Sequence, residues 1–166
     1  KKTLKNTDMI LYNSEQTKRT TEEIFPEAKS IANVNAYIIS NPVKKQWDNK
    51  DDDYFLYVGN MEKRKGVDLL IKGYLQYKSR GGKKKLILGG KMQEEEINQI
   101  VRSAMMLDED ITYLDYVTHD KKHELYASMS AFVFPSKAEG FGMPIIEVMR
   151  FKKPIIASNL PIFDEI

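Results

Sequence analysis

Residues 54–75 read YFLYVGNMEKRKGVDLLIKGYL, and this stretch decides the fold. Its first five residues are aliphatic or aromatic, as expected of a buried strand. A loop bounded by Gly59 and Gly66 follows. The next apolar residues recur at spacings of three, one, three and one, which puts them on one face of a helix: Val67, Leu70, Ile71, Tyr74 and Leu75. A strand followed by an amphipathic helix is the repeating unit of a parallel α/β sheet.

The same alternation continues to the end of the chain. Five mostly apolar strands are predicted, at residues 54–58, 85–88, 111–116, 131–134 and 154–157. Helices are expected from Val67, from the acidic run at residues 94–96, over residues 120–129, and from Pro144, a favoured first-turn residue. The pattern predicts an α/β fold, a Rossmann-like doubly wound parallel sheet.

Residues 1–48 are less regular. Short strands are predicted at residues 9–12 and 36–39, with a helix beginning near Ser14 between them. The polar stretch from Asn41 to Asp53 is typical of a linker. We therefore expect a boundary between residues 1–48 and residues 49–166.

Composition limits the possible functions. The chain has 166 residues, 42% of them hydrophobic, and a net charge of only +2, which argues against nucleic acid as the main partner. It has no cysteine, so disulfides and thiolate metal sites are excluded. We find no signal peptide and no apolar run of membrane-spanning length, and expect a cytoplasmic protein. Because it opens on Lys1 and stops at Ile166, we expect it to be a piece of a longer protein.

Residues 139–147, EGFGMPIIE, join a predicted strand to a predicted helix. Two glycines allow a ligand close to the backbone, and free N–H groups of a first helical turn attract anions. Glu139 and Glu147 would reach the same cleft at the carboxyl edge of the sheet and accept hydrogen bonds from sugar or ribose hydroxyls. The alternative is a tight turn with two solvated glutamates.

Residues 59–66, GNMEKRKG, leave the first strand at the same edge. Lys65 or Arg64 could neutralise a diphosphate and stabilise the charge that grows on such a leaving group. By itself, the loop pattern favours a solvated basic turn.

Together these motifs resemble a known family. The segments YVG at 57–59, KGVD at 65–68, FPS at 134–136 and EGFGMP at 139–144, with Glu147, are similar to the donor domain of glycosyltransferase family 4, the glycosyltransferases group 1. Glu139 and Glu147 match its E-x7-E motif. The resemblance covers roughly residues 54–166, and continues more weakly at residues 14–18 and 41–43.

The resemblance implies the C-terminal domain of a GT-B enzyme with strand order 3-2-1-4-5, truncated at its end. Residues 1–48 would be a remnant of the N-terminal acceptor domain with the interdomain linker, and residues 49–166 the nucleotide-sugar-binding domain. Such a hexosyltransferase moves a sugar, with retention of configuration, from a nucleoside-diphosphate sugar to an acceptor hydroxyl on a saccharide or lipid-linked saccharide, as in polysaccharide biosynthesis. This chain would bind the donor but be inactive alone.

The resemblance also assigns roles to residues. Lys65 would bind the diphosphate, Glu139 the donor sugar, and Glu147 the ribose hydroxyls, with Glu139 and Lys65 catalytic. The region of Tyr116 and Val117 would hold the nucleobase. The complete expected donor site is Gly59, Asn60, Arg64, Lys65, Tyr116, Val117, Glu139, Gly140, Phe141, Gly142, Met143, Pro144 and Glu147. Family members often carry arginine where this chain has Asn60, so one diphosphate contact is missing or is made by Arg64.

The expected partners are a UDP- or GDP-linked sugar and the missing acceptor domain, with possible peripheral membrane contact of the full-length protein. Neither a cofactor nor a metal ion is expected, since the resembled family is metal-independent. Two alternatives stay open: a nucleotide or nucleotide-sugar binding module without catalysis, and another GT-B enzyme such as an epimerase or a phosphorylase.

Several other patterns favour a structural interpretation. Asp51-Asp52-Asp53 precedes a strand, unlike a metal-binding DxD, and is expected to be a solvated linker. His119 and His123 share a helix face but have no evident third zinc ligand. The pairs Gly81-Gly82 and Gly89-Gly90 do not match a P-loop, and residues 140–145 do not match the dinucleotide motif of dehydrogenases.

Overall fold

The computed structural model describes residues 4–35, 48 and 50–166. These residues form two compact units. The first contains the described residues up to 35 together with 139–143 and 159–166, and the second contains residue 48 and residues 50–138 and 144–158.

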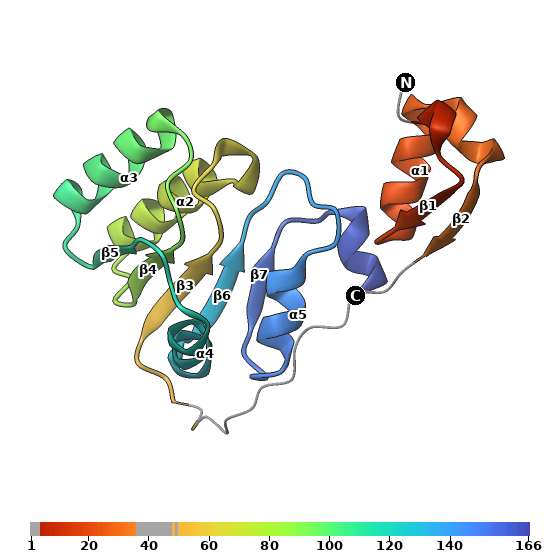
Figure 1. The fold of residues 1–166 in the computed structure, drawn as a ribbon. Helices are drawn as coiled ribbons and strands as arrows, with labels where there is room; N and C mark the ends of the chain where they lie inside the picture. The colour runs from red at the N-terminus through yellow and green to blue at the C-terminus, as the bar shows by residue number, and fades with distance from the viewer. Residues whose placement is uncertain (1–3, 36–47, 49) are drawn as a thin grey trace. The chain divides into compact units, whose positions relative to one another are not determined.

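The second unit is built on a parallel sheet of five strands (Figure 1). The strands are β3 (Tyr54–Val58), β4 (Lys85–Gly89), β5 (Ile111–Leu114), β6 (Ala131–Phe134) and β7 (Ile155–Ala157). Their spatial order is β5-β4-β3-β6-β7, with register pairs such as Leu56 opposite Ile87 and Phe132 opposite Ile155. The predicted α/β class and the strand order 3-2-1-4-5 are therefore confirmed.

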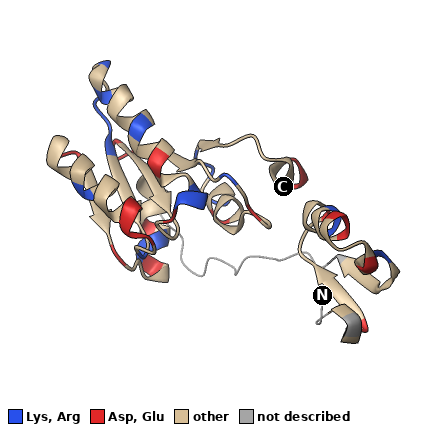
Figure 2. Ribbon diagram, turned by 90° about the horizontal axis from the view of Figure 1, so that it is seen from above, with Lys and Arg blue, Asp and Glu red and all other residues tan. Residues whose placement is uncertain are grey.

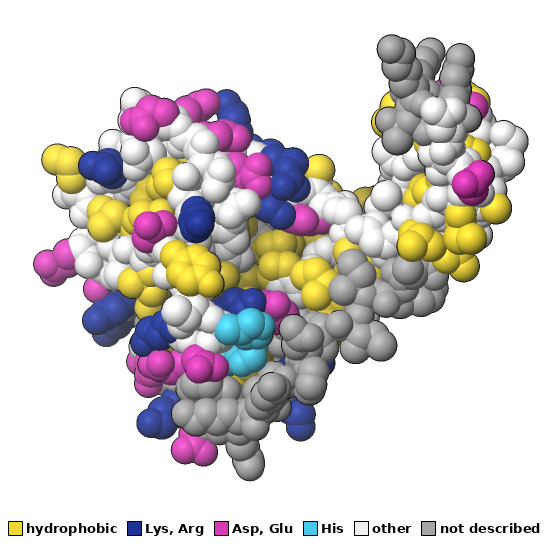
Figure 3. Space-filling view, in the orientation of Figure 1, with side chains coloured by type: hydrophobic (Ala, Val, Ile, Leu, Met, Phe, Trp, Pro, Cys, Tyr) yellow, Lys and Arg dark blue, Asp and Glu magenta, His cyan; other side chains and the backbone are white. Residues whose placement is uncertain are grey.

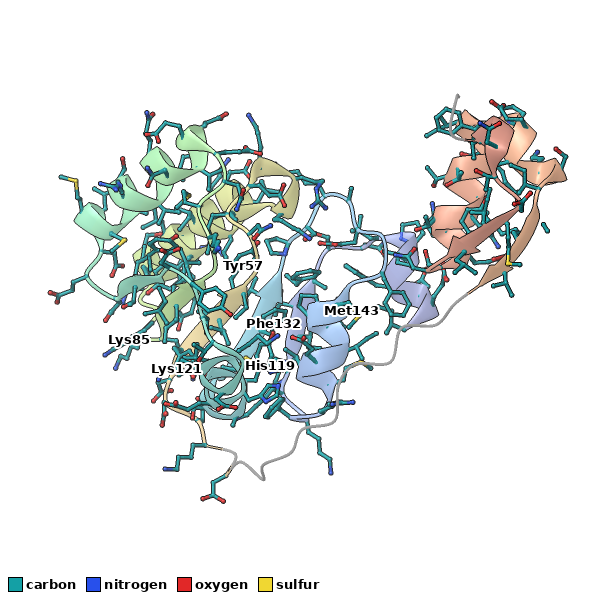
Figure 4. All side chains as sticks on the ribbon, viewed as in Figure 1. Tyr57, Lys85, His119, Lys121, Phe132 and Met143 are labelled. Carbon is teal, nitrogen blue, oxygen red and sulfur yellow. The ribbon has the colours of Figure 1, made fainter. Side chains whose placement is uncertain are left out.

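Helices cover both faces of this sheet, as a parallel sheet requires. Helices α2 (Val67–Ser79) and α3 (Glu95–Leu107) pack on the face that carries Tyr57, Leu86 and Leu88. On the other face lie α4 (His119–Ser128) and α5 (Met143–Met149). There the ring of Tyr126 meets that of Phe132 edge to face at 5.7 Å. Figure 4 labels Tyr57 on the central strand β3 and Phe132 on its neighbour β6, one side chain in each of these two cores.

An apolar groove of about 330 Å³ lies along α2 on the first of these faces. Its lining residues are Phe55, Leu69, Leu70, Gly73, Tyr74, Tyr77, Leu86, Val133, Pro135 and Ile156. Leu69 and Ile156 are 51% and 54% exposed, which is high for aliphatic residues packed beside a core. This groove is thus an accessible apolar surface on the second unit.

The first unit contains β1 (Met9–Tyr12) paired in parallel with β2 (Ala32–Asn35), and between them α1 (Glu15–Ile24) and the 3-10 segment η2 (Pro26–Ser30). Two further 3-10 segments are η1 (Leu4–Asn6) and η4 (Pro161–Glu165). The predicted strand at residues 9–12 and the helix starting near Ser14 are confirmed. The strand predicted at residues 36–39 lies outside the described residues.

Charged residues of both signs are interspersed over the helices of the second unit (Figure 2). The aspartates before β3 are exposed, as predicted for a linker, but they also have partners: Asp53 lies 2.7 Å from the Lys84 ammonium, and Asp51 accepts a hydrogen bond from Ser130. Among the helices that the structure describes, none has the length and apolar character needed to cross a membrane.

Candidate functional site

The loop after β3 is fixed by the loop after β4. The Gly59 N–H donates to the carbonyl of Gly89 at 2.9 Å, and the Met61 N–H donates to that of Lys91 at 2.8 Å. Met61 is fully buried. At Gly90, a φ of +134° brings the backbone so close to Gly59 that a Cβ would lie 2.0 Å from the Gly59 oxygen. The two loops therefore form one layer at the carboxyl edge of the sheet.

The same β3 loop also meets the segment that follows β6. It contains the 3-10 segment η3 (Lys63–Lys65), and Gly66 then opens α2 in the left-handed conformation. The Lys137 N–H donates to the Arg64 carbonyl, and an Arg64 guanidinium N–H donates to the Ala138 carbonyl, both at 2.8 Å. The predicted common edge concerned residues 59–66 and 139–147; the structure shows residues 59–66 in direct contact with the preceding segment 135–138.

The three basic residues of η3 have different surroundings. Lys63 pairs with Glu96 at 3.0 Å, and Arg64 pairs with Glu62 at 2.9 Å. The ammonium of Lys65 lies 5.8 Å from the centre of the Phe134 ring, a cation–π contact at the end of β6. Glu62 and the Ala138 carbonyl orient the Arg64 guanidinium and leave three of its five N–H donors for other partners. The predicted roles of Lys65 and Asn60 in donor binding stay predictions.

Tyr116 and Val117 follow β5 at the same edge. The strand ends at Leu114, two residues earlier than predicted, and beyond it the Gly90 N–H donates to the carbonyls of both Leu114 and Asp115. Val117 packs over Gly89, where a Cβ would lie 2.9 Å from its Cγ2. Tyr116 is 69% exposed and its ring lies 5.7 Å from the Lys91 ammonium. An exposed ring at this edge is a surface on which a nucleobase could stack.

Glu147 lies one turn inside α5 and is bound by two residues of α4. The ammonium of Lys122 lies 2.8 Å from both carboxylate oxygens, and the Tyr126 hydroxyl donates to Oε2 at 3.1 Å. Tyr126 is fully buried, and burial raises its pKa well above the ordinary range. Sequence analysis missed Lys122 and Tyr126. Their spacing of four on one predicted helix face was the available signal, but it does not say which residue they face.

The glycine segment 139–143 belongs to the first unit and is hydrogen-bonded to other residues of that unit. The Gly140 carbonyl accepts hydrogen bonds from the Ser14 hydroxyl at 2.9 Å and the Thr17 hydroxyl at 3.1 Å. Gly142 has φ of +93°, and a Cβ there would lie 2.9 Å from the Phe163 ring. Helix α5 begins at Met143, one residue before the predicted Pro144. The roles of Glu139, Phe141 and Met143, and a cleft shared with Glu147, stay predictions.

The two histidines lie side by side on α4, seen as neighbouring cyan side chains in Figure 3. Their rings are 4.7 Å apart, and the ring of His123 packs against Phe151 at 5.6 Å. His119 is exposed at the start of α4, whereas His123 is 8% exposed. His123 is therefore a packing residue of the second unit.

Comparison with known proteins gives the family. The family model for glycosyl transferases group 1 matches residues 40–166, most of the chain. The chain belongs to the glycosyl transferases group 1 family. A relative of this group 1 chain is the O-antigen chain mannosyltransferase B of Escherichia coli, 32% identical over 127 residues. Another is the O-antigen chain mannosyltransferase RfbU of Salmonella typhimurium, 27% identical over 150 residues.

These relatives are longer than the group 1 chain. The matches cover 75% and 89% of it but 33% and 42% of the two relatives. Among solved structures, a pneumococcal O-GlcNAc transferase GtfA in complex with UDP and GlcNAc matches with a TM-score of 0.73 and 15% identity. That match covers 96% of this chain and 31% of the transferase. At this identity the likeness shows the fold.

Proposed function

We propose that this chain is the donor-binding part of a retaining GT-B hexosyltransferase of glycosyltransferase family 4. The parent enzyme transfers a sugar from a UDP- or GDP-linked donor to an acceptor hydroxyl of a saccharide or lipid-linked saccharide. The observation that carries the proposal is the contact between residues 59–66 and 135–138 at the carboxyl edge of the sheet, where open α/β folds bind ligands. The relatives named as mannosyltransferases and the UDP-bound pneumococcal transferase support it.

Each part of the site has a task in this proposal. Lys65 neutralises the diphosphate as the bond to the sugar breaks, a charge that grows in the transition state. Glu147 accepts hydrogen bonds from the ribose hydroxyls, and Tyr116 and Val117 contact the base. Glu139 and the amides of residues 141–143 hold the donor sugar. No metal ion takes part.

The proposal is tested by calorimetric titration of UDP, GDP and ADP into the wild type and into Glu147→Ala and Lys65→Ala. A hydrogen bond to a charged group contributes about 1.5–3 kcal/mol, so each variant should weaken the preferred nucleotide at least about tenfold. Lys72→Ala, which removes an exposed lysine of α2, is the control and should bind as the wild type does. Unchanged affinity in Glu147→Ala would refute its ribose role, and absence of any nucleotide binding would refute the proposal.

The chain alone should not transfer sugar, because the acceptor-side groups of the proposed enzyme lie outside these 166 residues. The chain covers only 33% and 42% of the length of the two mannosyltransferase relatives, which supports this expectation. Incubation with UDP- and GDP-sugars and saccharide acceptors should give no product above the no-protein control. Robust transfer by the chain alone would contradict the proposal that the acceptor-side groups lie outside these 166 residues.

A further inference from the structure

The bonds around Glu147 leave a defined set of acceptor positions open. A carboxylate has about four lone-pair positions on its two oxygens. Tyr126 takes one on Oε2, and the Lys122 ammonium lies 2.8 Å from each oxygen. With the carboxylate held in this way, one acceptor position remains, on Oε1. A single ribose hydroxyl fits this position.

This cluster lies near the ligand edge of the sheet. Helix α4 begins at His119 and α5 at Met143, and both follow strands whose carboxyl ends form that edge. At 1.5 Å per residue, Lys122 and Glu147 lie only about 5–6 Å along their helices. Their side chains are 18% and 19% exposed, so the pair is screened from bulk water but not sealed. We expect a ligand at the edge to reach the partly exposed Glu147 while Lys122 and Tyr126 stay in place.

Stabilisation of the fold is a weak explanation for the Lys122–Glu147 ion pair. A largely buried ion pair contributes little net stability compared with apolar side chains of similar size, because both charges lose hydration. Lys122 has a different effect, which is to cancel the charge of Glu147. A bare carboxylate near a diphosphate would repel it, whereas a carboxylate paired with an ammonium can accept hydroxyls beside phosphates. The pair suits a site that takes hydroxyls and phosphates together.

We propose that Lys122 and Tyr126 are positioning residues that hold the Glu147 carboxylate for the ribose 2′-hydroxyl and so select ribonucleotides over 2′-deoxyribonucleotides. This inference rests on the proposed function, in which Glu147 binds the ribose. The phenol of Tyr126 remains a donor over the working pH range because burial raises its pKa. Lys122 and Tyr126 need not touch the nucleotide.

The test is the affinity ratio between UDP and 2′-deoxy-UDP, or GDP and 2′-deoxy-GDP if guanine is preferred, measured by calorimetry. The wild type should prefer the ribose form at least about tenfold, since one hydrogen bond to a charged acceptor is lost with the hydroxyl. Tyr126→Phe and Lys122→Gln should lower the ratio to about threefold or less. The loss should be confined to the ribose form in Tyr126→Phe, whereas Lys122→Gln should also weaken the deoxyribose form, because the unpaired Glu147 repels the diphosphate. Circular dichroism confirms that each variant is folded, and Tyr126→Phe keeps the packed ring.

Lys121→Gln is the matched control, because Lys121 neighbours Lys122 but pairs with the exposed Glu124 at 2.8 Å. It should keep the wild-type ratio. If Glu147→Ala abolishes the preference while Tyr126→Phe and Lys122→Gln retain it, the positioning roles are overturned and the proposed function stands. If the wild type binds both forms equally, the ribose role of Glu147 fails and this inference with it. A wild type that binds neither form overturns the proposed function itself.

Discussion

Gly66 has a strict backbone requirement in the site. Its φ is +70°, and a Cβ would lie 2.0 Å from the Pro135 carbonyl oxygen. Gly66→Ala should therefore destabilise the chain by at least about 2 kcal/mol, since the left-handed conformation alone costs roughly 1–2 kcal/mol and a backbone clash is added. Urea unfolding followed by circular dichroism measures the change.

Gly73 supplies the comparison for that experiment. It lies inside α2 with nothing within 4 Å of an added Cβ. Gly73→Ala should stabilise the chain by about 0.5–1 kcal/mol, because alanine loses less backbone entropy in a helix. Equal effects of the two substitutions would show that the contact between Gly66 and Pro135 does not constrain the loop.

Single residues also show what could and could not be predicted from the sequence. The presence of Gly66 at the end of the loop and the basic character of η3 could be read from the sequence. The bond of Arg64 to the Ala138 carbonyl could not, because it depends on the distance between two loops that are 74 residues apart in the chain.

At the scale of elements, the strands were predictable because their apolar runs are short and bounded by turns. The strands at 54–58 and 131–134 have the predicted bounds. The predicted strand 154–157 starts one residue later, at Ile155, since Pro154 has no N–H to donate. The Lys122–Glu147 pair was not predictable, because it requires knowing how α4 and α5 turn toward each other on the sheet.

Helix α4 should make stability depend on pH through His123. Burial lowers the pKa of His123, and the nearby charges of His119 and Lys122 act in the same direction, against weaker opposite effects of Glu147 and Asp120. Between this lowered pKa and the ordinary value of about 6.5, the unfolded chain binds more protons than the folded chain. Stability should therefore be complete above about pH 6.5 and decrease as the pH falls through the folded-state pKa.

The measurement is the free energy of unfolding in urea at several pH values from 7.5 to 5. His123→Gln should flatten the decrease relative to the wild type. His119→Gln, at the exposed neighbour, should leave most of it in place. Parallel curves for the wild type and His123→Gln would rule out His123 as the source.

At the scale of the whole molecule, each of the two units combines segments far apart in the sequence. Residues 139–143 and 159–166 join the first unit, where Glu165 accepts hydrogen bonds from the Glu15 and Gln16 N–H groups at the start of α1. The linear pattern predicted the sheet of the second unit almost completely. The pattern could not predict the hydrogen bonds from the Ser14 and Thr17 hydroxyls to the Gly140 carbonyl, because such bonds leave no periodic signal in the sequence.

The apolar groove along α2 affects how this protein should be assayed. Dyes such as ANS fluoresce on accessible apolar surface, and Leu69 and Ile156 leave such surface on the folded chain. The native protein at pH 7 should enhance ANS fluorescence. The double variant Leu69→Gln, Ile156→Thr should reduce this enhancement. An unchanged fluorescence signal in the double variant would show that the dye binds elsewhere. Melting curves recorded with hydrophobic dyes would then start from a high background, and variants of this chain are better compared by circular dichroism.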